Sequence, residues 1–232
     1  MNMQTAKPMN FHEQLAAQTA PDREFLINAP IIRRALAGQI SREEYVAFLT
    51  QAFHHVRHTV PLLMAVGARL PDRLGWLRKE IIHYTEEEEG HEQWILNDIE
   101  AAGGDAVAAS RSLPSTATDA MVAYAYDTAT RRNPVGFFGM VFVLEGTSVA
   151  LALNAADRLE STLQLPKRAL TYLRSHGQLD QEHVHHLYGI LNRLDEPDDR
   201  AAVERCAHVM FRLYGNMFRG LDEQATSPRR AA

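Results

Sequence analysis

The sequence predicts an all-α fold, arranged as a single domain of seven to nine helices. Apolar residues recur at i, i+3 and i+4 in long segments, which is the spacing of a helix with one buried face. No segment alternates apolar and polar residues as a strand would. The chain has 232 residues, of which 46% are hydrophobic and 23% charged, a composition that can bury a sizeable core. We expect the domain to cover residues 1–223 and residues 224–232 to form a disordered tail.

The first half of the chain contains two long helical segments. Ser41 and Glu44 form a capping-box pattern that begins the first of them, and Pro61 should kink this helix near Arg57 and His58. The helical segments expected in this half cover residues 10–19, 25–38, 41–70 and 73–102.

The second half contains the most apolar segment of the chain, residues 134–163. This segment is apolar all round, which predicts a buried central helix. Its glycines Gly136, Gly139 and Gly146 are expected to let neighbouring helices approach closely. The other helical segments expected here cover residues 115–132, 165–175, 179–194 and 198–221.

The composition excludes several classes of partner. The net charge is −5, and the chain has no basic face or run beyond Arg229 and Arg230, so we expect no nucleic acid. Cys206 is the single cysteine, so an intrachain disulfide and a cysteine-type zinc site are impossible. No segment has about 18 uninterrupted apolar residues, and residues 1–10 lack an apolar signal core. We therefore expect no membrane partner and a cytoplasmic location.

One motif near the end of the chain has the ligand types of a metal site. His176, Asp180 and His183 are spaced i, i+4 and i+7, so they share one face of a helix. Two imidazoles and a carboxylate that face the same way are suitable ligands for a transition metal. The same residues are equally compatible with a solvated helix surface, so the interpretation depends on what other segments supply.

A second candidate unit lies in the second long helix. Glu88 and His91 have the i, i+3 spacing of a Glu-x-x-His unit on one helix face, which recurs in helical carboxylate-bridged di-metal bundles. Glu87, four residues before His91, could serve in place of Glu88. Four consecutive glutamates at 86–89 are also typical of a solvated face, although Trp94 near His91 indicates that part of this face turns inward.

Glu145 lies in the middle of the most apolar segment. A carboxylate inside a dry helix is costly unless it is paired or coordinates a cation. A buried arginine, or a protonated carboxyl with hydrogen bonds, would satisfy it. We favour a third possibility, a cluster of metal ions.

The first long helix adds His54 and His58, which are one helical turn apart and could be further metal ligands or could support the ligands by hydrogen bonding. His55 is expected to point elsewhere. The main candidate set is three carboxylates and three imidazoles: Glu88, His91, Glu145, His176, Asp180 and His183. Six such ligands can hold two first-row metal ions with open positions, and they suit iron, or manganese, better than a structural zinc.

The order of these motifs resembles the haem-oxygenase-like di-iron oxidases and oxygenases. These proteins share a seven-helix bundle with haem oxygenase and the TenA/THI-4 proteins, and the resemblance covers most of the chain. It implies that the six residues above are iron ligands. Many members carry a further glutamate on the first long helix, where this sequence has His54, His55 and His58. Either a histidine substitutes there, or the first iron is held more weakly, or the site works with one metal.

The resemblance also implies an enzyme, a homodimer in which two iron ions use dioxygen to oxidise a small organic substrate such as an amino acid, a fatty acid or an amine. It assigns no catalytic residue beyond the metal ligands. The alternatives are a metal-free TenA/THI-4-like binding protein and a haem-binding protein. Thiaminase-type TenA chemistry needs a nucleophilic cysteine on the helix of Glu145, whereas Cys206 lies in the last helix.

Overall fold

The computed structural model of the chain describes residues 9–226, apart from the side chains at 178–181 and 223–226. Within this part the secondary structure is helical throughout and includes no strand, which confirms the predicted all-α fold. The last helix runs to Thr226, so the expected tail begins inside it and its remainder, 227–232, lies outside the described residues.

The described part contains twelve α-helices and three short 3-10 turns. The α-helices are α1 (Phe11–Gln18), α2 (Ala20–Ile27), α3 (Pro30–Leu36), α4 (Arg42–Val56), α5 (Thr59–Arg69), α6 (Gly75–Glu88), α7 (His91–Ala101), α8 (Ala106–Arg111), α9 (Thr116–Arg131), α10 (Phe137–Leu163), α11 (Thr171–Arg193) and α12 (Pro197–Thr226).

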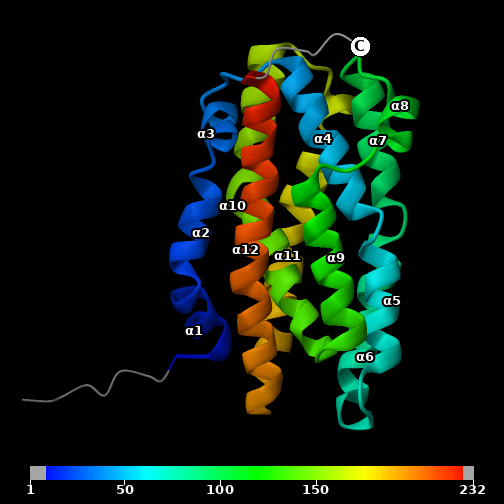
Figure 1. The fold of residues 1–232 in the computed structure, drawn as a ribbon, viewed down its shortest axis with the longest axis vertical. Helices are drawn as coiled ribbons and strands as arrows, with labels where there is room; N and C mark the ends of the chain where they lie inside the picture. Colours follow the sequence, from blue (N-terminus) through cyan, green and yellow to red (C-terminus); the bar gives the residue numbers. More distant parts are fainter. Residues whose placement is uncertain (1–8, 227–232) are drawn as a thin grey trace, which may run out of the picture.

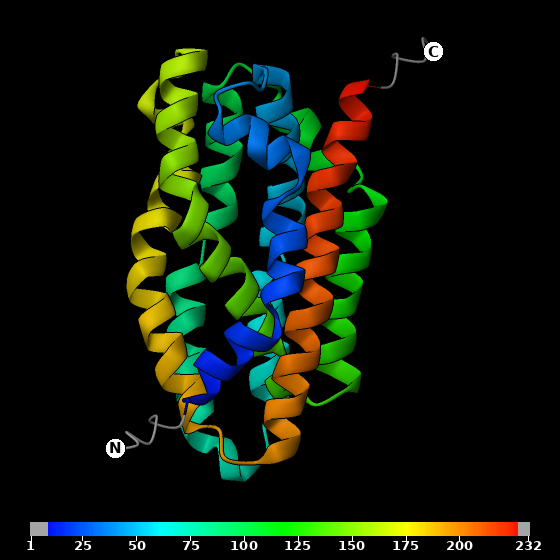
Figure 2. The same cartoon turned by 90° about the vertical axis from the view of Figure 1, so that its left-hand side faces the viewer.

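The helices form an elongated bundle in which α10 runs behind α12 in the view of Figure 1. Helix α10 packs along both α11 and α12, and α12 also packs along α2 and α9. Figure 2 shows the N-terminal helices, in blue, lying along α12. Helix α10 with its preceding turn is long and apolar enough to cross a membrane by length and composition, but 61% of its most apolar window is buried inside the bundle. Its buried residues lie mostly in its first half, so the prediction of a helix buried all round holds for that half, whereas the second half is partly exposed.

Two long helices expected from the sequence are each divided in two. The first ends at Val56 and resumes at Thr59, so that Pro61 falls in the first turn of α5, where a missing N–H does no harm. The second divides at Gly90, which has φ 86° and precedes α7. A glycine tolerates this left-handed conformation at no steric cost. Glu88 therefore ends one helix and His91 begins the next, and they do not share a continuous helix face.

Helix α11 is longer than expected, because the break anticipated near Gly177 does not occur. A side chain at Gly177 would lie only 2.7 Å from a side-chain carbon of Leu153 on α10. Gly177 is therefore a site of close helix contact within a continuous helix. His176 and His183 consequently lie on one rigid element.

The glycines of the central segment have different roles. Added side chains at Gly136 and Gly139 would meet backbone atoms of α12, at 3.1 Å from the Ala202 carbonyl oxygen and 2.3 Å from that of Val203. The expectation of close approach is correct for these two. It is wrong for Gly146, which has no atom within 4 Å of the added carbon.

Candidate metal centre

The break between α6 and α7 brings Glu88 and His91 together. The His91 Nδ1 atom lies 3.1 Å from Glu88 Oε2, and the two side chains are only 3% and 11% exposed. Two ligands that each bind one ion at roughly 2.1 Å lie about 3 Å apart. The spacing of this pair therefore suits two adjacent positions on one metal ion.

Helix α11 adds His176 to this pair. Glu88, His91 and His176 each offer a ligand atom, and these atoms lie within 4.8 Å of one another. The His91 and His176 rings meet edge to face, with centroids 4.9 Å apart. Trp94 stacks on His91 at 4.0 Å and Tyr172 contacts His176 at 4.7 Å, so aromatic neighbours restrict both imidazoles. One carboxylate and two imidazoles on three helices are a donor set that fits iron.

Two further predicted ligands, Glu145 and His183, lie around Tyr84 of α6. Glu145 and His183 are both only 8% exposed, and the Tyr84 ring centroid is 6.0 Å from that of His183. Burial and the neighbouring carboxylate of Glu145 raise the pKa of Tyr84. The side chain of Asp180 lies outside the described residues. The structure thus brings three of the six predicted ligands into one cluster and places two more beside it.

Glu87 contacts His183 and His83 rather than His91. Its Oε2 atom lies 3.4 Å from His183 Nε2, and its Oε1 atom lies 3.4 Å from His83 Nε2. The sequence left open whether Glu87 or Glu88 accompanies His91. In the structure Glu88 does so, and Glu87 contacts His183.

The histidines at the end of α4 are oriented differently from the expectation, in which His54 and His58 face the site and His55 points elsewhere. His54 Nε2 lies 2.9 Å from Ser112 Oγ, and His58 Nδ1 lies 3.1 Å from the Tyr126 hydroxyl. Neither is among the described residues that line the central cavity, whereas His55 is. Burial lowers the pKa of His55 to about 3, so its imidazole is neutral at physiological pH. The signal was available in the sequence, since His55 follows Phe48 and Ala52 at helical spacing.

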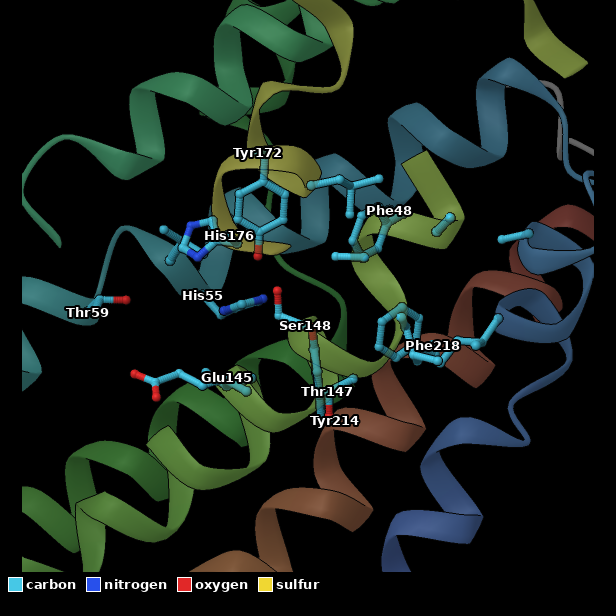
Figure 3. Close-up of a pocket in the computed structure, with 18 of the residues that line it drawn as sticks. Phe48, His55, Thr59, Glu145, Thr147, Ser148, Tyr172, His176, Tyr214 and Phe218 are labelled. Carbon is cyan, nitrogen blue, oxygen red and sulfur yellow. The ribbon is translucent and has the colours of Figure 1, made fainter. Parts of the chain in front are cut away.

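A cavity of about 170 Å³ adjoins the candidate metal centre. Its lining includes Glu88, Glu145 and His176 at one side, and apolar residues of α3, α4, α10 and α12 elsewhere. Figure 3 shows Glu145, His176 and His55 around this space. A small molecule in this largely apolar cavity would therefore lie beside the candidate metal ligands.

Asp98 of α7 anchors the start of the helix that carries His176. It is fully buried, and its Oδ2 atom accepts a 2.8 Å hydrogen bond from the Tyr172 backbone N–H. This bond supplies an acceptor to the first turn of α11, whose N–H groups have no partner within the helix. Asp98 therefore positions His176 relative to His91.

Burial raises the pKa of Asp98 from 3.8 to about 6. The folded chain thus favours the protonated form, and the stability it contributes is complete below about pH 3.8 and lost as the pH rises through about 6. We expect the free energy of unfolding of the iron-free wild type to fall, relative to an Asp98→Asn variant, by about 1.4 kcal/mol between roughly pH 5 and 7.5. Urea unfolding at both pH values measures this difference. Glu100→Gln is an exposed change on α7, and its free energy of unfolding should change with pH as that of the wild type does. If the Asp98→Asn variant also showed the same pH dependence as the wild type, the prediction would be contradicted.

Comparisons with known proteins agree with this architecture. The sequence profile of a family described as iron-containing redox enzymes matches residues 46–215. The comparison with curated proteins finds no match. Among solved structures, a domain of unknown function with a haem oxygenase-like fold from Shewanella denitrificans is 22% identical, with a TM-score of 0.85 over 97% of this chain and 100% of that one.

Two further structures show the same fold. A TenA homologue from Pseudomonas syringae is 10% identical, with a TM-score of 0.79 over 92% of this chain and 93% of that one. Haem oxygenase-1 from the cyanobacterium Synechocystis, solved with haem, is 13% identical, with a TM-score of 0.73 over 93% and 94%. At these identities the likeness establishes the haem oxygenase-like fold. The profile match covers most of the chain, and the chain belongs to the family of iron-containing redox enzymes.

Proposed function

We propose that the protein is a non-haem iron oxidase or oxygenase that uses dioxygen to oxidise a small organic substrate. The observation that carries the proposal is the convergence of Glu88, His91 and His176 from three helices, with ligand atoms within 4.8 Å of one another. Glu145, Asp180 and His183 would complete a centre for two iron ions, with manganese as the other metal that these ligands suit.

The protein's own residues hold and orient this centre. Glu88, His91 and His176 would bind the ion, Trp94 and Tyr172 restrict the two rings, and Asp98 fixes the start of α11. A bound ferrous ion supplies the one-electron and dioxygen chemistry. The apolar cavity next to it limits the access of water and accommodates the substrate.

The composition and the family resemblance together support further proposals about the protein's setting. We infer a cytoplasmic homodimer whose small partners are dioxygen and the substrate, and which binds neither nucleic acid nor membrane. Size-exclusion chromatography with light scattering would measure the mass of the assembly.

The alternative is a metal-free TenA/THI-4-like binding protein. The 3.1 Å contact between His91 and Glu88 favours it, because the two groups satisfy one another without a metal. Thiol chemistry of the thiaminase type is disfavoured, because Cys206 is buried on α12 against Gly139. Burial raises the pKa of its thiol to about 12, so the reactive thiolate is scarce.

Haem binding is the weaker alternative. The cavity of about 170 Å³ is smaller than the roughly 300 Å³ of pockets for drug-sized ligands. The N-terminal histidine, His12, bonds to Asn192 at 2.9 Å and stacks on Tyr188. Gly136 and Gly139 pack against α12. A Soret band that appears when haem is added would support haem binding.

Anaerobic titration with ferrous iron tests the proposed function. We expect at least one tightly bound iron per chain, and two if Glu145, Asp180 and His183 hold a second ion. His183→Ala and Asp180→Ala should each lower this number while the helical circular dichroism stays unchanged. Iron well below one per chain in the wild type would reject the oxidase proposal. Oxygen consumption with amino acids, fatty acids and amines would then identify the substrate.

A further inference from the structure

The central cavity has one polar side and a long apolar remainder. The apolar part lies between α3 and α10 and includes Ile31, Ile32, Leu36, Leu151 and Leu159. All five are aliphatic, and Ala152 and Ala155 beside them leave room. An engineered apolar cavity of about 150 Å³ binds benzene. A space of about 170 Å³ therefore suits about six to eight carbon atoms.

Two polar side chains in the cavity wall, the buried His55 and the half-buried Ser148, have buried polar atoms with hydrogen-bonding capacity to spare. Among the described residues, neither ring nitrogen of His55 has a hydrogen-bond partner, and nor does Ser148 Oγ. His55 is only 2% exposed. Figure 3 shows His55, from α4, and Ser148, from α10, pointing toward one another across the cavity. Buried polar groups normally find partners, so the two groups are placed to bind a polar group of a molecule in the cavity.

His55 is outside the candidate metal cluster. The cluster of ligand atoms within the described residues contains Glu88, His91 and His176 and does not include it. The ring of His55 instead meets Tyr214 edge to face, at 5.7 Å. Its nitrogens are therefore placed to bind a molecule in the cavity rather than an ion that this cluster would hold.

The hydrogen-bonding pattern selects the polar group of that molecule. A neutral imidazole and a hydroxyl each offer both a donor and an acceptor. A hydroxyl ligand can accept from one of them and donate to the other, whereas a carboxylate can only accept and an ammonium can only donate. The described lining also contains no lysine or arginine to balance a carboxylate, and it already includes Glu88 and Glu145.

We propose that the cavity binds a medium-chain aliphatic molecule of about six to eight carbon atoms whose uncharged polar group, such as a hydroxyl, hydrogen-bonds to His55 and Ser148. The chain lies among the aliphatic residues of α3 and α10. The polar group then lies beside Glu145 and His176, so the adjoining carbon lies near the candidate metal ligands. The inference rests on the proposed function only in this last respect.

Calorimetric titration of the iron-free and the anaerobic iron-loaded protein tests the proposal. The probes are octan-1-ol, octanoate, octylammonium and 1-methoxyheptane, an ether of the same length that accepts but cannot donate. We expect octan-1-ol to bind about tenfold more tightly than each of the others, because a lost hydrogen bond to a buried group has roughly this effect. Butan-1-ol should bind at least about tenfold more weakly than octan-1-ol, because it buries less apolar surface.

Variants locate the polar subsite. His55→Phe and Ser148→Ala should each bind octan-1-ol and 1-methoxyheptane with nearly equal affinity, a loss of discrimination that simple damage to the cavity would not produce. Ser148→Ala is the smaller change and remains informative if His55→Phe folds poorly. Ser161→Ala, an exposed change on the same helix, should retain the discrimination.

Three results would overturn the inference: no binding of octan-1-ol, equal or tighter binding of octanoate or octylammonium, or unchanged discrimination in both variants. Binding to the iron-free protein does not depend on the metal. Failure of the inference is thus distinct from failure of the proposed function, which the iron titration reports.

Discussion

A His176→Ala variant is expected to lose the tightly bound iron of the proposed site, which Glu88 and His91 would also ligate. His176 is the ligand that α11 contributes to the cluster, and no other described residue of that helix belongs to it. Loss of groups that merely support a ligand weakens metal binding by about 10- to 100-fold, so loss of the ligand should cost about 100-fold or more. Anaerobic titration with ferrous iron measures the affinity.

Thermal unfolding with and without ferrous iron gives a second measurement of the same variant. An ion at about 100 times its dissociation constant stabilises the folded protein by about 2.7 kcal/mol. The wild type should show this increase and His176→Ala should not. His186→Ala is the matched control, because His186 lies on the same helix, is largely exposed, and pairs with Glu80 at 2.9 Å. Equal iron affinity in the wild type and His176→Ala would reject the assignment of this site.

The second large effect is on stability, at Gly139. The added carbon of Gly139→Ala would lie 2.3 Å from the Val203 carbonyl oxygen and 2.7 Å from the Ala207 backbone nitrogen. Both are backbone atoms of α12 and cannot rotate away, so α10 and α12 must separate. We expect the free energy of unfolding to fall by about 3 kcal/mol, the upper range for overpacking. Urea unfolding of the iron-free protein measures it.

Gly146→Ala, seven residues further along α10, is the control for the effect of helix propensity alone. Gly146 lies on α10 with no atom near the position of an added carbon. Gly146→Ala should therefore raise the free energy of unfolding by about 0.5–1 kcal/mol, since glycine is a poor residue for a helix interior. Changes of the same sign in the two variants would show that close contact with α12 is not what distinguishes Gly139.

Local patterns along the chain were sufficient for the fold class and for much of the site. Helical periodicity predicted the all-α fold, because the spacing of buried residues on a helix is a property of neighbouring positions. Glu88, His91 and His176 were identified by residue type and spacing, and the structure places them together. The apolar surroundings of Glu145 predicted its burial, and it is only 8% exposed.

Other features depend on how distant segments pack. The left-handed conformation of Gly90 divides the Glu-x-x-His unit between two helices, and the contact with Leu153 keeps α11 continuous through Gly177. Tertiary contacts also decide which of His54, His55 and His58 lines the cavity. Ser112 and Tyr126 bind His54 and His58, while His55 faces the cavity.

Short-range spacing is thus enough to predict a helical bundle and a set of carboxylates and imidazoles on its helices, because both are properties of neighbouring positions. The tertiary structure decided which of these side chains meet and which nitrogens stay available to a ligand. It also decided the shape of the cavity. These properties arise where residues far apart in the chain come within a few ångströms, a relation that no local pattern encodes.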